Sequence, residues 1–600
     1  DICSISDHPV IDNFCALLHP LDIKKIRYRC RSTMFAPATL VATLASLLGA
    51  AAGAKSFLEI DADAKAVAEA ALLWSEVEST WAPGFAQQRL VKLEAALEPM
   101  YTALPKNENG KLGIPVARYA LHRLFEQMHS WYVKGLHPGA GGRNSSSSAD
   151  PLGLVAPEAL QGLLSDLGSH GLALHELAVL AAALEANIHA EASHQLSSLY
   201  STLGKTSEVT LDASQLAKLV DEYMTIYISG AKFLNVTAQE VEKDTKFMLE
   251  RTSGWKENQD WMRETRENVM TAEKLCREGA DCSHNFNTTL NVTEEVVQKY
   301  GSFNDKGCQQ LKTALLKIED KKSGRVPLAS FYKEGLAGVW EFNEKVEYLR
   351  ALGALDESVP NKPRVIVPNY VSSWVNCLTS SKFYAVCCRS ECEDILGYLE
   401  RQVAAPYAES HKLLELITAL PKDVVSEEPR KISELLVERL GKIAAMHQGT
   451  VPLHGRLFAQ WLHHVFPRSC PYPREVGTSN PQTADEWMQE TGHTGIKASP
   501  EEITRYIGNV AFAIQGDDLV DEDDSPDLPW SDSEELLVIR PSPPSEEPPS
   551  YLLEATLLVE VVASLAALFA VLWAAKLVAK RKKVQSVMAE KLRSGCKMDL

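Results

Sequence analysis

Apolar residues recur at helical spacing along most of the chain. Residues 90–97 carry leucine at every third or fourth position, and residues 114–136 continue the same spacing. Positions three and four apart share one face of an α-helix, whereas strands alternate with a period of two. The best strand candidate is residues 365–371 (VIVPNYV), where Pro368 restricts a strand to a sheet edge or an extended loop. The pattern predicts a mainly α-helical fold.

An apolar stretch near the start of the chain predicts a secretory signal peptide at residues 34–54. Met34 opens a run of small and apolar residues that ends in Ala-Gly-Ala immediately before Lys55. This is the arrangement of a hydrophobic region followed by an A-x-A cleavage site. Residues 1–33 are then an upstream leader or read-through, and the mature chain starts near Lys55. The alternative is a buried Ala/Leu helix inside a cytosolic domain.

A second apolar stretch predicts a transmembrane helix at residues 556–579. Its central sequence, LLVEVVASLAALFAVLWAAKLV, is close to the ~20 residues that a helix needs to cross a bilayer. Basic residues follow in a tail at 580–600, and acidic residues precede the helix. Because positive charge marks the cytoplasmic side of a membrane, we expect a single-pass type I protein with a cytoplasmic C-terminus. The alternative is a buried amphipathic helix.

Changes of composition divide the region between the two apolar stretches. Glycine and serine dominate residues 138–150 (PGAGGRNSSSSAD), which predicts a flexible linker. Acidic residues and proline dominate the segment before the transmembrane helix, which predicts a solvated, semi-extended stalk. The predicted domains are an N-terminal helical domain at 55–137, a helical, EF-hand-like domain at 151–350, a Cys/His-containing helical domain at 351–515 and the stalk at 516–555.

The cysteines and the N-glycosylation sequons lie where a lumenal or extracellular region would carry them. Eight of the 12 cysteines fall between the signal peptide and the transmembrane helix, and an even number fits a compartment that forms disulfides. Eight cysteines allow roughly a hundred pairings, so no connectivity is predicted. Two of them, four residues apart at positions 388 and 392, are expected on one face of a helix. The disulfide candidates are Cys276, Cys282, Cys308, Cys377, Cys387, Cys388, Cys392 and Cys470. The N-x-[ST] sequons stand at Asn144, Asn235, Asn287 and Asn291.

The block at 151–350 loosely resembles EF-hands, because helices alternate with short turns that carry one β-like residue. An EF-hand loop needs oxygen ligands at positions 1, 3, 5 and 12 around a glycine at position 6. With Gly324 at position 6, these positions hold Glu319, Lys321, Ser323 and Ser330. A cation at position 3 and the missing carboxylate at position 12 argue against tight Ca²⁺ binding. Glu319 and Ser323 remain the calcium candidates, and an unrelated helical bundle is the alternative fold.

Histidines in the third block are the best candidates for a metal site. His447 and His454 lie seven residues apart, and His463 and His464 follow on the next predicted helix. A zinc hydrolase typically carries H-E-x-x-H, with the catalytic carboxylate between the ligands, and no such motif occurs here. His454, His463 and His464 are therefore metal candidates without a recognisable catalytic base, against the alternative of packed or surface histidines.

Two segments of the third block carry a resemblance. They are FYAVCCRSEC at 383–392 and VPLHGRLFAQWLHHVFPRSCPYP at 451–473. The pair resembles a family of protist membrane proteins, notably dinoflagellate-like ones. The resemblance implies a membrane protein and implies no activity.

Net charge restricts the class of partner. The chain carries 61 Lys+Arg against 79 Asp+Glu, a net charge of −18. A general nucleic-acid binder needs a basic face that displaces counterions from phosphates, so no nucleic acid is predicted as a partner. We expect a membrane-integrated protein of the secretory pathway or cell surface with a binding or organising role and protein partners. The alternatives are a calcium-responsive EF-hand-like protein and a metal-dependent secretory-pathway enzyme; no cofactor is assigned, with Ca²⁺ or Zn²⁺ as the candidates.

Overall fold

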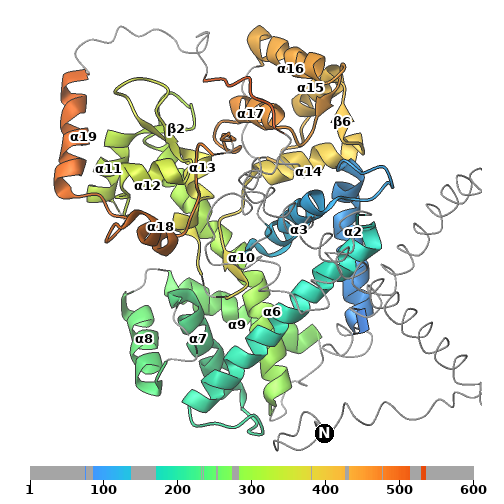
Figure 1. The fold of residues 1–600 in the computed structure, drawn as a ribbon. Coiled ribbons are helices and arrows are strands. Elements are labelled where there is room, and N and C mark those ends of the chain that lie inside the picture. Colours follow the sequence, from blue (N-terminus) through green and yellow to red (C-terminus); the bar gives the residue numbers. More distant parts are fainter. Residues whose placement is uncertain are drawn as a thin grey trace, which may run out of the picture. The chain divides into compact units, whose positions relative to one another are not determined.

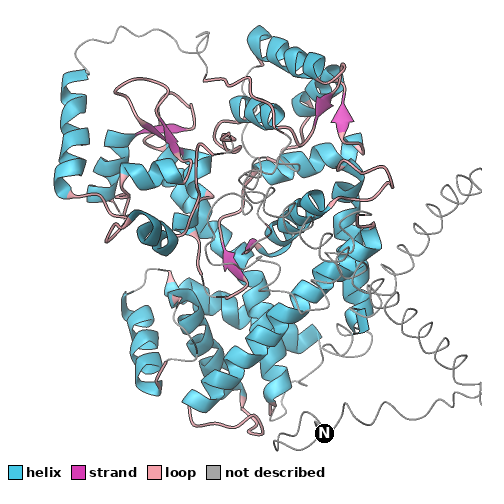
Figure 2. Ribbon diagram, in the orientation of Figure 1, coloured by secondary structure: helices cyan, strands magenta, loops and turns pink. Residues whose placement is uncertain are grey.

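In the computed structural model, every residue described below belongs to one compact unit within residues 65–600. The described residues are 74–75, 85–134, 136, 171–230, 233, 236–251, 254–272, 283–338, 340–379, 381–425, 432–475, 477–513 and 529–535. The described part is mainly helical, as predicted, with short strands only (Figures 1 and 2). Within it, no helix combines the length and apolar character that a bilayer crossing requires. The predicted signal peptide, linker and transmembrane helix lie outside these residues.

The first hydrophobic core is mainly helical, built largely from the N-terminal half of the chain, and it also includes residues of two short strands. The long helix α6 packs along α2, and its alanine-rich middle is buried, which permits a close approach between the two helices (Figure 1). Asp212 caps the next helix through the Gln215 N–H, and Gly230 ends it in a left-handed conformation. The helices of this core are α2 (Phe85–Ala103), α3 (Ile114–His129), α6 (Leu174–Thr202), α7 (Ala213–Ser229), α8 (Ala238–Arg251), α9 (Trp255–Ala272) and the first half of α10 (Phe286–Leu316).

The helix predicted at 114–136 ends early, and its last residues form a strand. Ser130 is left-handed, with φ of 56°, and its N–H closes the helix on the Glu126 carbonyl. The strand β1 (Trp131–Val133) then pairs antiparallel with β5 (Tyr384–Val386) (Figure 2). The prediction was wrong here because the partner strand lies about 250 residues further along the chain, beyond the reach of local periodicity.

The second core surrounds a three-stranded sheet of order β2-β4-β3, in which Val326 lies opposite Val365. The strand predicted at 365–371 is half right, since the strand ends at Ile366 and a short helix follows. Pro368 stands in the first turn of that helix, where a missing N–H leaves no hydrogen bond unmade. The elements are β2 (Arg325–Pro327), α11 (Leu328–Ala337), α12 (Val346–Ala351), β3 (Leu355–Asp356), β4 (Arg364–Ile366), α13 (Val367–Val371), the 3-10 turn η3 (Trp374–Asn376), α18 (Ala484–Thr491) and α19 (Pro500–Ala513).

The third core is formed mainly by four helices and two short strands in the described part of residues 392–465. Trp461 is fully buried in it, and the indole N–H donates to the Leu436 carbonyl at 2.8 Å. Its elements are α14 (Cys392–Val403), β6 (Tyr407–Ala408), α15 (Ser410–Thr418), α16 (Glu434–Met446), β7 (Val451–Pro452) and α17 (Arg456–Val465). The second core takes residues from both sides of position 350, so it crosses the predicted boundary between the second and third domains.

Candidate functional site

Six of the eight disulfide candidates are joined in three pairs. Cys308 on α10 is bonded to Cys388, Cys377 to Cys387, and Cys392 at the start of α14 to Cys470 after α17. The first bridge lies at the second core and the third bridge at the third core, so the short segment from Cys388 to Cys392 is tied to both cores. The two cysteines at positions 276 and 282 lie outside the described residues.

The expectation that Cys388 and Cys392 share a helix face is wrong. Cys388 precedes α14 in an irregular segment, whereas Cys392 is the first residue of that helix. Each therefore reaches its own partner, Cys308 and Cys470, on different elements.

The three histidine metal candidates are buried and point to three different sets of partners. His454 Nε2 lies 2.8 Å from Glu400 Oε1, and His464 Nε2 lies 3.2 Å from the Pro529 carbonyl oxygen. His463 Nδ1 lies 2.7 Å from the Cys470 carbonyl oxygen. Within the described residues, no three His, Cys, Asp or Glu side chains converge as metal ligands would. The rings of His463 and His464 lie 5.4 Å apart between centroids, and each of the three histidines has its own hydrogen-bond partner.

His463 is held as a neutral imidazole by its two partners. A carbonyl oxygen only accepts, so Nδ1 carries the proton that is donated to Cys470. Arg325 only donates, so Nε2 accepts from its Nη2 at 3.2 Å. Burial, reinforced by the positive charge of Arg325, lowers the pKa of His463 well below its usual range. The Nε2 lone pair is consequently engaged by a cation of the protein itself.

His454 belongs to a buried charge network that joins the first core to the third. Arg123 on α3 donates to both oxygens of Glu400 on α14, at 2.5 and 3.2 Å, and its Nε donates to Glu393 at 2.5 Å. Burial alone would raise the pKa of Glu400, but Arg123 and His454 hold it at about 2. Burial lowers the pKa of His454. The second ring nitrogen, Nδ1, has no hydrogen-bond partner among the described residues, and the ring is 2% exposed.

The loop around Gly324, which carries the calcium candidates, is closed by an arginine. Arg468 donates from Nε to Glu319 Oε2 at 3.2 Å and from Nη2 to the other oxygen, Oε1. Glu319 Oε2 also accepts from the Gly324 N–H at 3.1 Å, and the Ser323 hydroxyl accepts from the Arg325 N–H at 3.2 Å. The Arg468 guanidinium therefore binds both oxygens of the Glu319 carboxylate, the group that an EF-hand would use at position 1 to bind Ca²⁺.

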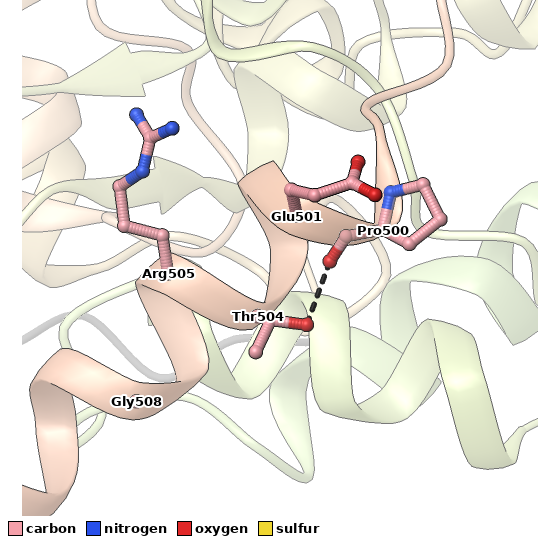
Figure 3. Close-up of a pocket in the computed structure, with 5 residues that line it drawn as sticks. All are labelled: Pro500, Glu501, Thr504, Arg505 and Gly508. Atoms are coloured by element: carbon pink, nitrogen blue, oxygen red, sulfur yellow. Dashed lines mark hydrogen bonds between the residues drawn. The ribbon is translucent and has the colours of Figure 1, made fainter.

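Two hollows in the described surface are poor small-molecule sites. The hollow in Figure 3 is lined only by residues of α19, where the Thr504 hydroxyl donates to the Pro500 carbonyl at 2.7 Å, so it has a single wall. The other hollow lies beside Lys312, Glu391 and Arg468 and has a volume of about 20 Å³. That volume holds about one water molecule, whereas ligand pockets typically exceed roughly 300 Å³.

A better-formed binding surface lies on α16 and α17, and part of the predicted stalk occupies it. Residues 529–535 (PWSDSEE) lie against these helices and are partly buried, except for the exposed Asp532 and Ser533. The Trp530 ring lies under Arg439, 4.5 Å from its guanidinium carbon to the ring centroid, and stacks on His464 with 5.8 Å between ring centroids. These seven residues of the predicted stalk therefore have partners on the third core for their side chains and carbonyls.

Buried Arg456 is the centre of this surface. Its Nε donates to the Ser533 carbonyl at 2.7 Å and its Nη2 to the Ser531 carbonyl at 2.9 Å. Its Nη1 donates to Gln460 Oε1 at 3.1 Å, and its backbone N–H donates to the Glu535 carbonyl at 2.7 Å. The side chain is 0% exposed, so the contacts with residues 529–535 satisfy donors that would otherwise lose their partners.

The carboxylate of Glu534 is held at the start of α17. Its Oε1 accepts from the Leu457 N–H at 3.1 Å, and its Oε2 lies 3.1 Å from His447 Nε2. The free N–H groups of a helix N-terminus favour an anion at this position. His447, one of the four histidines considered above for a metal site, is thus a contact of the docked segment.

The residues predicted from the sequence do not include Arg123, Glu400, Arg439 or Arg456. One signal in the sequence could nevertheless have revealed the docked segment. Trp530 is the only aromatic residue in the acidic stretch 516–550. A large indole side chain stabilises a structure only when it is buried. A single tryptophan in a solvated segment therefore indicates a contact with a folded surface.

Two of the four sequons lie on described residues. Asn287 and Asn291 are exposed on the first turns of α10. The hydroxyl-bearing residues of these sequons, Thr289 and Thr293, are fully buried. Asn144 and Asn235 lie outside the described residues.

Comparison with family models, with curated proteins and with solved structures finds no match for this chain.

Proposed function

We propose that the chain is a single-pass type I membrane protein whose disulfide-stabilised helical ectodomain has a binding or organising role at a membrane surface. The three disulfides carry this proposal, because such bridges persist in oxidising compartments and are rare in the cytosol. The apolar sequence at 557–578 and the basic residues after it supply the anchor and its orientation. Its partners are the membrane and other proteins.

Protease protection in sealed microsomes tests the topology. With a cytoplasmic C-terminus, added protease should remove only the short tail at 580–600 from the full chain. Digestion of the large helical region while the membrane stays sealed would contradict the proposal. Detergent should make the whole chain accessible in both cases and serves as the control.

Thiol counting tests the compartment. The full chain isolated from cells in the presence of an alkylating reagent should show no free thiol at Cys308, Cys377, Cys387, Cys388, Cys392 or Cys470. Glycosidase treatment of the same sample should increase its mobility if the exposed Asn287 and Asn291 carry glycans. Free thiols at all six positions, together with unchanged mobility, would place the chain in a reducing compartment and refute the proposal.

A calcium-responsive function is the second candidate, and one observation favours it. Strands β2 and β4 pair antiparallel with Val326 opposite Val365, and each strand runs directly into a helix, as the paired loops of EF-hands do. The engagement of Glu319 by Arg468 argues against a bound cation in the first loop. Calorimetry of the full chain with Ca²⁺ distinguishes the two functions, since binding heat at micromolar Ca²⁺ would favour the second candidate.

A further inference from the structure

The segment 529–535 contacts the third core through alternate backbone carbonyls. His464 lies against the carbonyl of Pro529, Arg456 binds the carbonyls of Ser531 and Ser533, and the Arg456 N–H binds the carbonyl of Glu535. Alternate carbonyls point the same way only when a chain is extended, because the period of an extended chain is two residues. The surface of α16 and α17 thus binds one edge of an extended backbone. Most of its hydrogen bonds are to backbone carbonyl oxygens, which any peptide sequence carries.

Two side chains add selectivity to this backbone recognition. Trp530 contacts both Arg439 and His464, and Glu534, four residues later, contacts both the Leu457 N–H at the α17 N-terminus and His447. When a protein binds an extended peptide, hydrogen bonds to the peptide backbone typically provide the affinity. Pockets for individual side chains provide the specificity. A cation over an indole and a carboxylate at a helix N-terminus are both favourable contacts.

We propose that α16 and α17 form a peptide-recognition groove, and that its ligand is the chain's own residues 529–535. The ligand class is an extended acidic peptide with a tryptophan and a glutamate four residues apart. The segment acts as a detachable clasp that holds the acidic stretch onto the third core. This inference goes beyond the proposed membrane function and does not depend on it, because every contact lies between residues 439–475 and 529–535.

Because the clasp is part of the same chain, its effective concentration at the groove is higher than that of a free peptide in solution. Only 15 residues, 514–528, separate the end of α19 from Pro529. A tethered ligand at such a short separation has an effective concentration of the order of millimolar. A free peptide of the same sequence should therefore bind the wild-type chain roughly 10- to 100-fold more weakly than a chain whose clasp is disabled.

The test uses a fluorescent peptide with the sequence of residues 527–537, DLPWSDSEELL, and the full chain in detergent. The variant Trp530→Ala/Glu534→Ala disables the clasp and leaves the groove unchanged. It should bind the peptide at least about 10-fold more tightly than the wild type. Peptides that lack the tryptophan or the glutamate should bind this variant much less tightly. The control variant Ser533→Ala should behave as the wild type, since the groove contacts the carbonyl and not the hydroxyl of this residue.

Hydrogen exchange supplies an independent readout. The N–H groups of Arg456 and Leu457 donate to the clasp, so their exchange should accelerate in the disabled variant and slow again when the peptide is added. Equal peptide binding by wild type and variant would overturn the proposal, as would unchanged exchange in the first turn of α17. A wild-type dimer that becomes monomeric on Trp530→Ala would also overturn it, because the ligand would then come from a second copy.

Discussion

Arg123 on α3 and Glu400 on α14 form a bidentate ion pair across 277 residues of sequence, with N–O distances of 2.5 and 3.2 Å. Both side chains are at most 2% exposed. The pair connects two hydrophobic cores through charges that water does not screen. Each charge therefore depends on the other to offset the free-energy cost of its removal from water.

Loss of Arg123 should destabilise the protein strongly. The substitution Arg123→Met leaves the buried carboxylate of Glu400 and the neighbouring Glu393 without their common cation, which costs about 3–5 kcal/mol in comparable buried pairs. The matched control is Arg350→Ala, which removes an equally bidentate pair with Glu357 that is about half exposed. The control should cost less than about 1 kcal/mol. Urea unfolding measures both, and equal losses would contradict the network.

Glu344 should make stability fall as the pH rises towards neutrality. Burial raises the pKa of Glu344 from 4.5 to about 7, although the Tyr370 hydroxyl donates to its Oε1 at 3.0 Å. The folded state therefore binds the proton more tightly than the unfolded state. Its contribution to stability is complete below pH 4.5 and is lost between pH 4.5 and 7, by at most about 3 kcal/mol.

The substitution Glu344→Gln isolates this effect from other titrating groups. The variant should gain stability relative to the wild type as the pH rises from 4.5 to 7, and the difference should then remain constant. Its amide can also hydrogen-bond where the carboxylate oxygen Oε2 now has no partner among the described residues. Glu347→Gln on the exposed side of α12 is the control and should stay within about 0.5 kcal/mol at each pH. A pH-independent difference between Glu344→Gln and the wild type would refute the assignment.

The two long disulfide loops should contribute more stability than the short one. The bridges Cys308–Cys388 and Cys392–Cys470 close loops of 80 and 78 residues, whereas Cys377–Cys387 closes one of 10. Chain-entropy arguments give about 4–5 kcal/mol for each long loop and about 3 kcal/mol for the short loop. Paired alanine substitutions at each bridge, compared by urea unfolding, should follow this order. A larger loss for the short loop would contradict the unfolded-state explanation.

The fold class could be predicted from the sequence because helix periodicity is a local signal. Leu90, Leu93 and Leu97 are all buried in the first core, where their spacing places them on one face. The strand that ends the helix after His129 could not be predicted, because Trp131 pairs with Val386 and the intervening chain carries no trace of that contact.

The candidate sites were less predictable because they depend on distant partners. The sequence singled out His454, His463 and His464 as a group, yet each ring contacts a partner from a different distant segment: Glu400, Arg325 and the Pro529 carbonyl. Arg468 lies 149 residues after Glu319, so the sequence of the loop alone could not reveal the guanidinium that engages it. A histidine or glutamate suggests metal binding from its type alone. The residues that contact it in the fold determine whether its ligand atoms are available.

Because Gly324 closely approaches Pro467, we expect its replacement by alanine to lower the free energy of unfolding. Gly324 has a φ of +68°, a conformation that costs an alanine about 1–2 kcal/mol, and an added Cβ would overlap the Pro467 carbonyl oxygen. Relief of that overlap must separate the loop from the turn that carries Arg468, which adds roughly 1–3 kcal/mol. Gly324→Ala should therefore cost about 2–5 kcal/mol in urea unfolding.

Gly449 offers a matched control for the backbone contribution alone. It also has a positive φ, +95°, but an added Cβ there meets no atom within 4 Å. Gly449→Ala should consequently lose only about 1–2 kcal/mol. The excess loss at Gly324 measures the contact between the loop and the turn. If the two alanine variants lost the same free energy, Pro467 would not lie against the loop, and the engagement of Glu319 by Arg468 would lose its structural support.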